Sequence, residues 1–388
     1  MSVDVAKMKR GAAELYNHVV TSASSQAVID RYTIDTNELR SIADVDGSLY
    51  ELEPKSNQTF ESPKCADSVP DPIALHVGEH IVENPFVARL RGCQLLGPKG
   101  LTVTSDGRYV LENALRSEDL LMRSILKTVR EGSLPIRRRT VDTTVDNAIS
   151  LVGPWCEGYF HWFSEYLPRL EGVAQLADQN GATPTVIIPP DPPVWMRKSL
   201  SLVGFDDYVT WDGGRVDATE LLIPSLCRSH PVNSPNQYAN ATTGYQWVSR
   251  RVLQNLDPSA GLDDSPRGIY VSRRHADERH VVNEAEVMDL LAAYDFELYE
   301  LETMSFPNQI RLFERADAVV APHGAGLVNI MYGTDLSVVE LFGNYVNGCY
   351  YTMAEGLGFE YGCLKCDPVG SDLRVDVDRL EGLLERVL

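Results

Sequence analysis

Residues 318–326 (AVVAPHGAG) place a histidine and two glycines directly after a short apolar run. The run predicts a strand that is buried on both faces, and residues 327–332 predict the opening of a helix. A helix that begins at such a turn has free N–H groups and a partial positive charge, and glycines let a phosphate approach. His323, Gly324, Ala325 and Gly326 therefore form a candidate phosphate site. The alternative is a tight turn in which the glycines only permit close packing.

Two residues beyond this turn belong to the same candidate site. Glu340 lies near the carboxyl end of the strand predicted over residues 338–342, where a carboxylate could hold a ribose. Asn329 occupies the place of the third glycine in the dinucleotide fingerprint G-x-G-x-x-G, which argues against an NAD site. A dehydrogenase or epimerase would also need such a fingerprint early in the chain, and none is present there.

A second group of chemically suited residues lies earlier in the chain. His161 and Glu165 are four residues apart in a predicted helix, so both side chains lie on one helix face. Arg273 and Arg274 follow a run that predicts a buried strand, and one of them should face the ligand site, because the arginine fork suits a diphosphate. The alternatives are a surface pair on the helix and two solvated arginines.

Alternating strand and helix patterns predict two α/β units that position these groups. Strands are predicted over residues 148–152, 185–188, 220–224, 268–272, 296–299, 317–321 and 338–342. An Asp-Gly pair at 106–107, between two alternating runs, predicts a β-hairpin. The Ser-, Asn- and Pro-rich residues 225–245 predict a linker between the units.

The chain is therefore divided into three parts. Residues 1–85 are predicted to be an irregular extension with a short helix at 12–22, because proline and glycine interrupt every periodic run. Residues 86–230 and 231–388 are predicted to be two α/β domains. The second ends in an amphipathic helix that could pack back across the linker.

Three motifs resemble the sequences of glycosyltransferase family 61. They are FHWFSEYLPRL at 160–170, GIYVSRR at 268–274, and HGAGLVN at 323–329 with VVELF at 338–342. The resemblance covers residues 145–345 in the family's order. Members include capsular polysaccharide biosynthesis proteins, plant xylan transferases and O-linked N-acetylglucosamine transferases of the secretory pathway. The resemblance implies a GT-B fold, in which two doubly wound, Rossmann-like domains face each other across a cleft.

The resemblance also implies an activity and roles for the candidate residues. It implies an inverting glycosyltransferase that uses a nucleoside-diphosphate sugar, with no metal or other cofactor, and a glycan or lipid-linked glycan as acceptor. In relatives with a similar helix an acidic residue four after the histidine is the base, which implies Glu165 as base, with His161 orienting the acceptor or serving as base itself. Residues 86–230 would then hold the acceptor and residues 231–388 the donor. The alternative is a non-catalytic nucleotide- or sugar-binding protein on the same fold.

Composition limits the setting in which the protein works. The 388 residues carry 35 Lys and Arg against 55 Asp and Glu, a net charge of −20. Such a charge repels nucleic acid and fits a high-salt cytoplasm, so a halophilic archaeal source is expected; the alternative is an acidic surface of no special meaning.

No apolar stretch approaches about 18 residues, and the N-terminus has no signal-peptide core. Seven scattered cysteines indicate reduced thiols, and Cys363 with Cys366 lacks the second pair of a metal site. A cytoplasmic protein is expected, with a peripheral position at the inner face of the membrane and the oligomeric state left open.

We expect the fold to depend on high salt. Repulsion among surface carboxylates grows as the screening length rises from about 3 Å at 1 M salt to about 10 Å at 0.1 M. Thermal unfolding at the two salt concentrations measures this, and the melting temperature should be lower at 0.1 M. Equal melting temperatures would contradict a halophilic origin.

Overall fold

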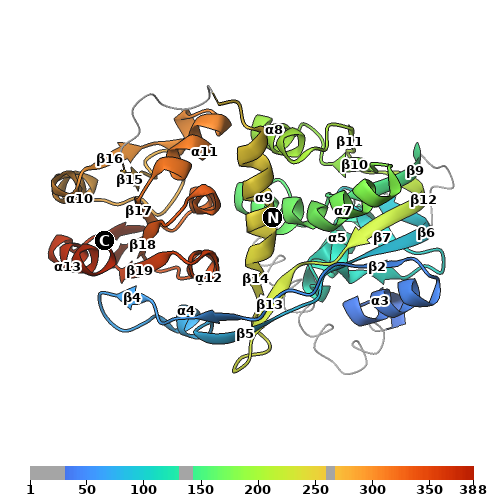
Figure 1. Ribbon diagram of the computed structural model, residues 1–388, viewed down its shortest axis with the longest axis horizontal. Coiled ribbons are helices and arrows are strands. Elements are labelled where there is room, and N and C mark those ends of the chain that lie inside the picture. Colours follow the sequence, from blue (N-terminus) through green and yellow to red (C-terminus); the bar gives the residue numbers. More distant parts are fainter. Residues whose placement is uncertain (1–30, 131–142, 259–266) are drawn as a thin grey trace, which may run out of the picture.

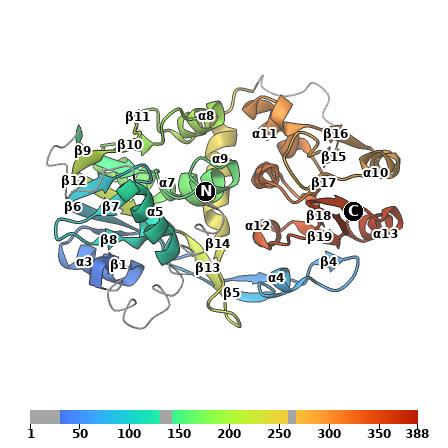
Figure 2. The same ribbon diagram turned by 180° about the vertical axis from the view of Figure 1, so that it is seen from behind.

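The protein has two lobes with a long helix between them, as the computed structural model shows (Figure 1). The structure describes residues 31–130, 143–258 and 267–388, so the helix predicted over 12–22 lies outside the described residues. Helix α9 (Thr242–Asn255) runs between the lobes in both views (Figures 1 and 2). Within the described ranges, none of the helices combines the length and apolar character that crossing a bilayer requires.

The sheet of the first lobe is mixed rather than purely parallel. Its parallel part contains β12 (Arg215–Pro224), β9 (Thr143–Ser150), β10 (Thr185–Ile188) and β11 (Tyr208–Thr210), in this spatial order. Helices α7 (Leu170–Asn180) and α8 (Val194–Val203) connect β9 to β10 and β10 to β11. The predicted alternation of strands and helices is therefore present here, with α7 and α8 both packed on one face of the parallel strands.

The rest of that sheet is antiparallel in its main pairings, which the prediction missed. Strand β6 (Phe86–Leu96) pairs antiparallel with β12 and with β7 (Leu101–Val103), and β7 pairs with β8 (Tyr109–Val110) through the predicted Asp-Gly hairpin. A long strand followed by a tight hairpin must reverse direction, so these strands cannot continue a parallel sheet. The sheet is completed by β1 (Thr33–Ile34) and β2 (Leu49–Glu51), with helices α3 (Thr36–Val45) and α5 (Glu118–Arg130) nearby.

The sheet of the second lobe is wholly parallel. Its order is β16 (Phe296–Tyr299), β15 (Gly268–Val271), β17 (Ala318–Pro322), β18 (Ser337–Phe342), β19 (Glu360–Lys365) and β4 (Lys64–Cys65). Chain order and spatial order from β15 to β19 give the 2-1-3-4-5 arrangement of doubly wound folds. Its helices are α10 (Glu284–Leu291), α11 (Phe306–Arg315), a 3-10 helix (Ala325–Tyr332), α12 (Cys349–Leu357) and α13 (Val377–Val387).

Both faces of this second sheet are covered, which explains why its central strand β17 is apolar at every position. In β17, Val319 and Ala321 belong to the core shared with α11 and the 3-10 helix, whereas Ala318 and Val320 belong to a core with α10 and α13. Side chains alternate across a strand, so a strand covered on both faces needs a continuous apolar run. Helix α13 packs against β18, β19 and β4, not across the predicted linker.

Residues 31–85 of the predicted extension form strands that pair with strands of the predicted linker. Strands β3 (Gln58–Phe60) and β5 (Gly78–Val82), on either side of α4 (Asp71–Ala74), join β13 (Arg228–Pro231) and β14 (Ala239–Asn240) in a four-stranded sheet. Strand β4, from the same N-terminal region, forms the edge of the second lobe's sheet. Residues 31–85 are thus not an irregular extension: β3 and β5 pair with each other, and β5 and β4 also gain partners from segments far along the chain.

One apolar core connects both lobes through α9. Trp162 and Leu170 of the first lobe, Val248 and Val252 of α9, and Leu327 of the second lobe are all buried in it. Helix α9 contacts α8 on one side and α12 and the 3-10 helix on the other. Separating the lobes would expose this core to water, which is unfavourable.

We expect acid to destabilise the protein through His76 and His80. Both are buried, and burial lowers the pKa of each, to about 4 for His76. The unfolded chain takes up a proton near pH 6.5, so stability present above that pH is lost as the pH falls towards 4. His76 alone should cost about 2 kcal/mol between pH 7 and pH 5.

Urea unfolding of wild type and His76→Gln at both pH values measures this effect. The variant should lose less stability on acidification than wild type. His275→Gln is the matched control, since His275 is half-exposed and pairs with Glu300 in the other lobe. An equal loss in wild type and His76→Gln would show that His76 does not carry the effect.

Candidate active site

The helix that carries His161 and Glu165 contains an irregular turn. Short helix α6 (Tyr159–His161) runs into a π-helical turn (Trp162–Tyr166) and a 3-10 turn (Leu167–Arg169) before α7 begins. The sequence predicted a helix for His161 and Glu165 but not this irregular turn. Pro168 has no N–H to donate to the preceding turn, which helps to explain the irregular hydrogen bonding. Single π turns inside helices are frequent at functional sites.

His161 and Glu165 contact each other, as their spacing predicted. The Nδ1 atom of His161 lies 2.8 Å from Oε2 of Glu165, and the two side chains are 31% and 7% exposed. A carboxylate that accepts the Nδ1 proton holds the ring in the tautomer whose Nε2 lone pair can take another proton. The indole of Trp155 stacks on this ring with the centroids 4.9 Å apart. The His161 ring is therefore the more exposed member of the pair, and the Glu165 carboxylate orients it from the more buried side.

The pair lies in a pocket to which both lobes contribute. The pocket has a volume of about 320 Å³. Besides His161 and Glu165, it is lined by the β13–β14 connection, by Tyr245 of α9, and by Asn347, Cys349 and Thr352 of the second lobe. A ligand here would therefore touch both lobes at once.

The glycine turn of the second lobe presents a second oriented histidine. The Nδ1 atom of His323 lies 2.5 Å from Oε1 of Glu340, and the hydroxyl of Tyr361 donates to Oε2 of Glu340. Glu340 is 0% exposed. The sequence suggested that Glu340 holds a ribose, but both of its oxygens are already occupied inside the core. In the structure, Glu340 lies on the buried side of His323 and orients its ring.

Of the two arginines, Arg273 lies against the glycine turn. Its Nε and Nη2 atoms donate to the carbonyl of Glu278, and Nη1 occupies the space that a side chain on Gly324 would need. Burial, together with Arg279, lowers the pKa of the Arg273 guanidinium.

Arg274, in contrast, forms ion pairs with Glu284 at 2.8 Å and Glu300 at 3.1 Å. Its expected ligand contact is therefore not supported.

The remaining predicted residues have packing roles as well. An added Cβ on Gly326 would meet Leu301 at 2.6 Å, so this glycine allows close packing, which was the alternative considered. Asn329 is buried, accepts from the hydroxyl of Tyr159 at 2.7 Å and donates to Gln309 at 3.1 Å. It thus holds the start of the His161 helix to the second lobe and is closed to a ligand.

Ala325 and Gly326 nevertheless border a second pocket between the lobes. This pocket has a volume of about 480 Å³ and is lined mainly by aromatic and apolar side chains. Tyr159 and Trp195 come from the first lobe, and Met304 and Phe306 from the second. Flat walls of this kind suit a planar ring such as a nucleobase.

Tyr350 connects the two histidine sites and was missed by sequence reasoning. Its hydroxyl donates to the carbonyl of Gly324 at 2.7 Å, and its ring contacts those of His323 and Phe160 at 5.4 and 5.5 Å. Phe160 directly precedes His161. No local pattern marks Tyr350, because its neighbours come from segments distant in the sequence.

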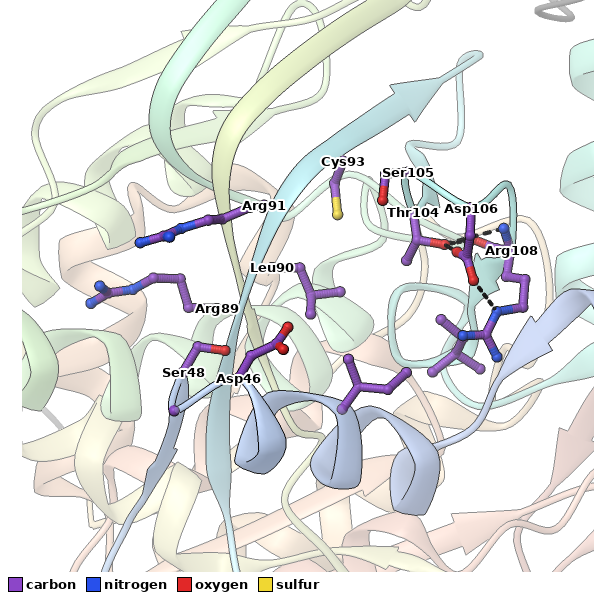
Figure 3. Close-up of a pocket in the computed structure, with 13 residues that line it drawn as sticks. Asp46, Ser48, Arg89, Leu90, Arg91, Cys93, Thr104, Ser105, Asp106 and Arg108 are labelled. Carbon is purple, nitrogen blue, oxygen red and sulfur yellow. Dashed lines mark hydrogen bonds and ion pairs between the residues drawn. The ribbon is translucent and has the colours of Figure 1, made fainter.

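A larger cavity of about 680 Å³ lies elsewhere, between α3 and the hairpin of the first lobe (Figure 3). Its arginines are already paired with carboxylates: Arg89 and Arg91 with Glu220, and Arg108 with Glu38 and Asp106. It contains none of the predicted site residues. Across the described residues, no group of three His, Cys, Asp or Glu side chains is arranged to hold a metal ion.

Comparison with known proteins shows which family the central segment resembles. Residues 159–339, just under half of the chain, match the family model Glycosyltransferase 61. This segment is similar to glycosyltransferase family 61. This segment begins at the His161 helix and ends in β18, so it contains His161, Glu165, Arg273 and His323.

Curated relatives point the same way. EGF domain-specific O-linked N-acetylglucosamine transferases of Gallus gallus, Mus musculus and Drosophila melanogaster are 28%, 26% and 31% identical over 176, 173 and 159 residues. These matches cover about 40% of this chain, and the chain spans about a third of the length of these relatives. The family 61 match and these relatives together support a glycosyltransferase enzyme.

We expect Gly324→Ala to weaken binding of a nucleoside diphosphate to the family 61 segment. Gly324 has extended backbone (φ −173°) that alanine adopts freely, so the new methyl group acts by displacing the Arg273 guanidinium. Losing one hydrogen bond from a charged group should lower the affinity about tenfold. Titration calorimetry with UDP and GDP measures this.

Gly343→Ala is the matched control. An added Cβ at Gly343 makes only ordinary contacts, 3.5 Å from Asp372 and Leu373. Its nucleotide affinity and melting temperature should equal those of wild type. If Gly324→Ala also binds like wild type, the diphosphate does not lie at Arg273.

Proposed function

We propose that this protein is an inverting glycosyltransferase that moves a sugar from a nucleoside-diphosphate sugar to a hydroxyl group of a glycan or glycoconjugate. One observation carries the proposal. Two histidines, each oriented by a carboxylate, come from opposite lobes and are connected through Phe160 and Tyr350. One can act as a base, and the other stands beside an arginine and a glycine turn suited to phosphate.

The first lobe would supply the base. The hydroxyl proton of the acceptor moves to Nε2 of His161 while Glu165 stabilises the charge that forms on the ring. The acceptor oxygen then attacks the anomeric carbon from the face opposite the diphosphate, and inversion results. Glu165 as the direct base is the other reading; it lines the same pocket, but its lower exposure favours the histidine.

The second lobe would stabilise the leaving group. As the bond from sugar to phosphate breaks, negative charge grows on the diphosphate. Arg273, the His323 ring and the free N–H groups at the start of the 3-10 helix supply complementary positive charge. The pocket lined by Trp195 and Phe306 would take the nucleobase. With these groups present, turnover should continue in EDTA.

The wider setting is part of the same proposal. Two sheets with a ligand site between them fit the GT-B arrangement. A role in surface or capsular polysaccharide synthesis, a cytoplasmic location and a halophilic source remain expectations from the sequence. The relatives named above act on EGF domains, so a protein-linked acceptor is also worth testing.

The roles of His161 and Glu165 can be tested by substitution. General-base catalysis contributes roughly 10²- to 10⁴-fold to a rate. We expect His161→Ala to lose about that much turnover, and Glu165→Gln to lose less, because it still holds the ring in place. Nucleoside diphosphate release from a panel of sugar donors, in EDTA and with glycan acceptors, measures turnover, and calorimetry measures donor affinity.

The outcomes separate the alternatives. Donor affinity should stay near wild type in both variants, and His275→Ala is the control for an unspecific effect of removing a histidine. Full activity of His161→Ala with loss in Glu165→Gln would make the carboxylate the base. Full activity of both would place the base elsewhere. Donor binding without any turnover in wild type would favour the non-catalytic sugar-binding alternative.

A further inference from the structure

A groove on the first lobe leads directly to His161. It has a volume of about 510 Å³ and is lined by Lys99, by one face of α5, and by the loop before α6. Helix α5 lies on the surface of the first lobe (Figure 2). The groove and the inter-lobe pocket have two lining residues in common, Trp155 and His161. A chain-like ligand lying in the groove would therefore present its end to the proposed base.

Trp155 separates the groove from the pocket in an unusual conformation. It is 51% exposed, and its φ of 58° lies in the left-handed region that bulky residues avoid. Such strain concentrates at sites that clamp ligands. Its indole already stacks on His161, so the large exposed ring offers a surface on which a sugar ring can lie beside the base.

The groove is basic although the protein is strongly acidic. Arg123 and Lys127 are four residues apart on α5 and face the groove together with Lys99, and Glu157 is the single carboxylate among its lining residues. Lys99 pairs with Glu157 at 3.2 Å and Arg123 with Asp119 at 2.7 Å. Lys127 makes no ion pair with any residue in the described ranges. Two of the eight lysines of the chain are thus concentrated here.

We propose that this groove is the acceptor subsite and that it selects an acidic oligosaccharide, one that carries carboxylate, sulfate or phosphate groups. The term acceptor rests on the proposed function, but binding itself does not. With a net charge of −20, the rest of the surface repels an anionic glycan. Recognition therefore depends on this local positive charge, which holds the acidic groups while Trp155 stacks on a sugar ring next to His161.

Direct binding to the whole chain, without donor, tests the inference. The probes are tetragalacturonate, its fully methyl-esterified form, which has the same size but no charge, and a sulfated heparin tetrasaccharide. Binding is followed by tryptophan fluorescence at the lowest salt concentration at which the protein is folded, because salt screens the interaction. At least one acidic probe should bind about tenfold or more tightly than the neutral ester.

Lys127→Gln should weaken binding of that acidic probe about fivefold, and binding of the ester not at all. Lys365→Gln is the matched control, because Lys365 is an exposed lysine at the end of β19 in the other lobe. Trp155→Ala should weaken binding of both acidic and neutral probes.

The inference is overturned if acid and ester bind equally, if neither acidic probe binds, or if Lys127→Gln and Lys365→Gln bind alike. These outcomes differ from failure of the proposed function. Selective binding of an acidic probe without sugar transfer would support the acidic subsite and contradict the proposed transferase. Transfer to neutral acceptors, with equal binding of acid and ester, would support the transferase and contradict the acidic subsite.

Discussion

The two large sheets of this protein pack on one apolar core, and the relative position of the candidate site residues in the two lobes depends on this shared core. Trp162 and Leu170, Val248 of α9, and Leu327 belong to a single buried cluster. Because water would have to enter this core before the lobes could part, their relative position is fixed by the hydrophobic effect. The hydrogen bond from Tyr159 to Asn329 adds a directional link between the lobes. The two pockets between the lobes have no lining residue in common.

Each lobe orients one histidine with one carboxylate, but the two pairs differ in burial. Glu340 is enclosed by His323 and Tyr361 and has no free oxygen, so it acts only by holding the imidazole. Glu165 borders the pocket and also holds Nδ1 of His161. The difference matches the two tasks of a transfer reaction. A base needs a proton acceptor that the substrate can reach, whereas a group that contacts a leaving diphosphate needs a fixed position.

Charge is distributed unevenly over this acidic chain. Positive side chains lie in the groove beside Trp155, at the glycine turn through Arg273, in the aromatic pocket through Lys198, and at the large cavity of the first lobe. At the large cavity, carboxylates pair with all of the arginines. A guanidinium that is already paired has little left to offer an anion, because its donors are used. This distinguishes Arg273 from its neighbour Arg274, and Lys127 of the groove from the arginines of the larger cavity.

The sequence by itself determined the features that depend on neighbouring residues. The predicted strands at 185–188 and 296–299 have the observed bounds, the hairpin forms at its Asp-Gly turn, and His161 meets Glu165 because helical spacing alone brings positions i and i+4 together. Tertiary structure alone decided which of Arg273 and Arg274 faces the turn, that Glu340 is enclosed, and that residues 31–85 and 225–245 pair in one sheet. Periodicity tells which face of an element is apolar, but a partner hundreds of residues away is chosen by packing of the whole chain, which leaves no local pattern.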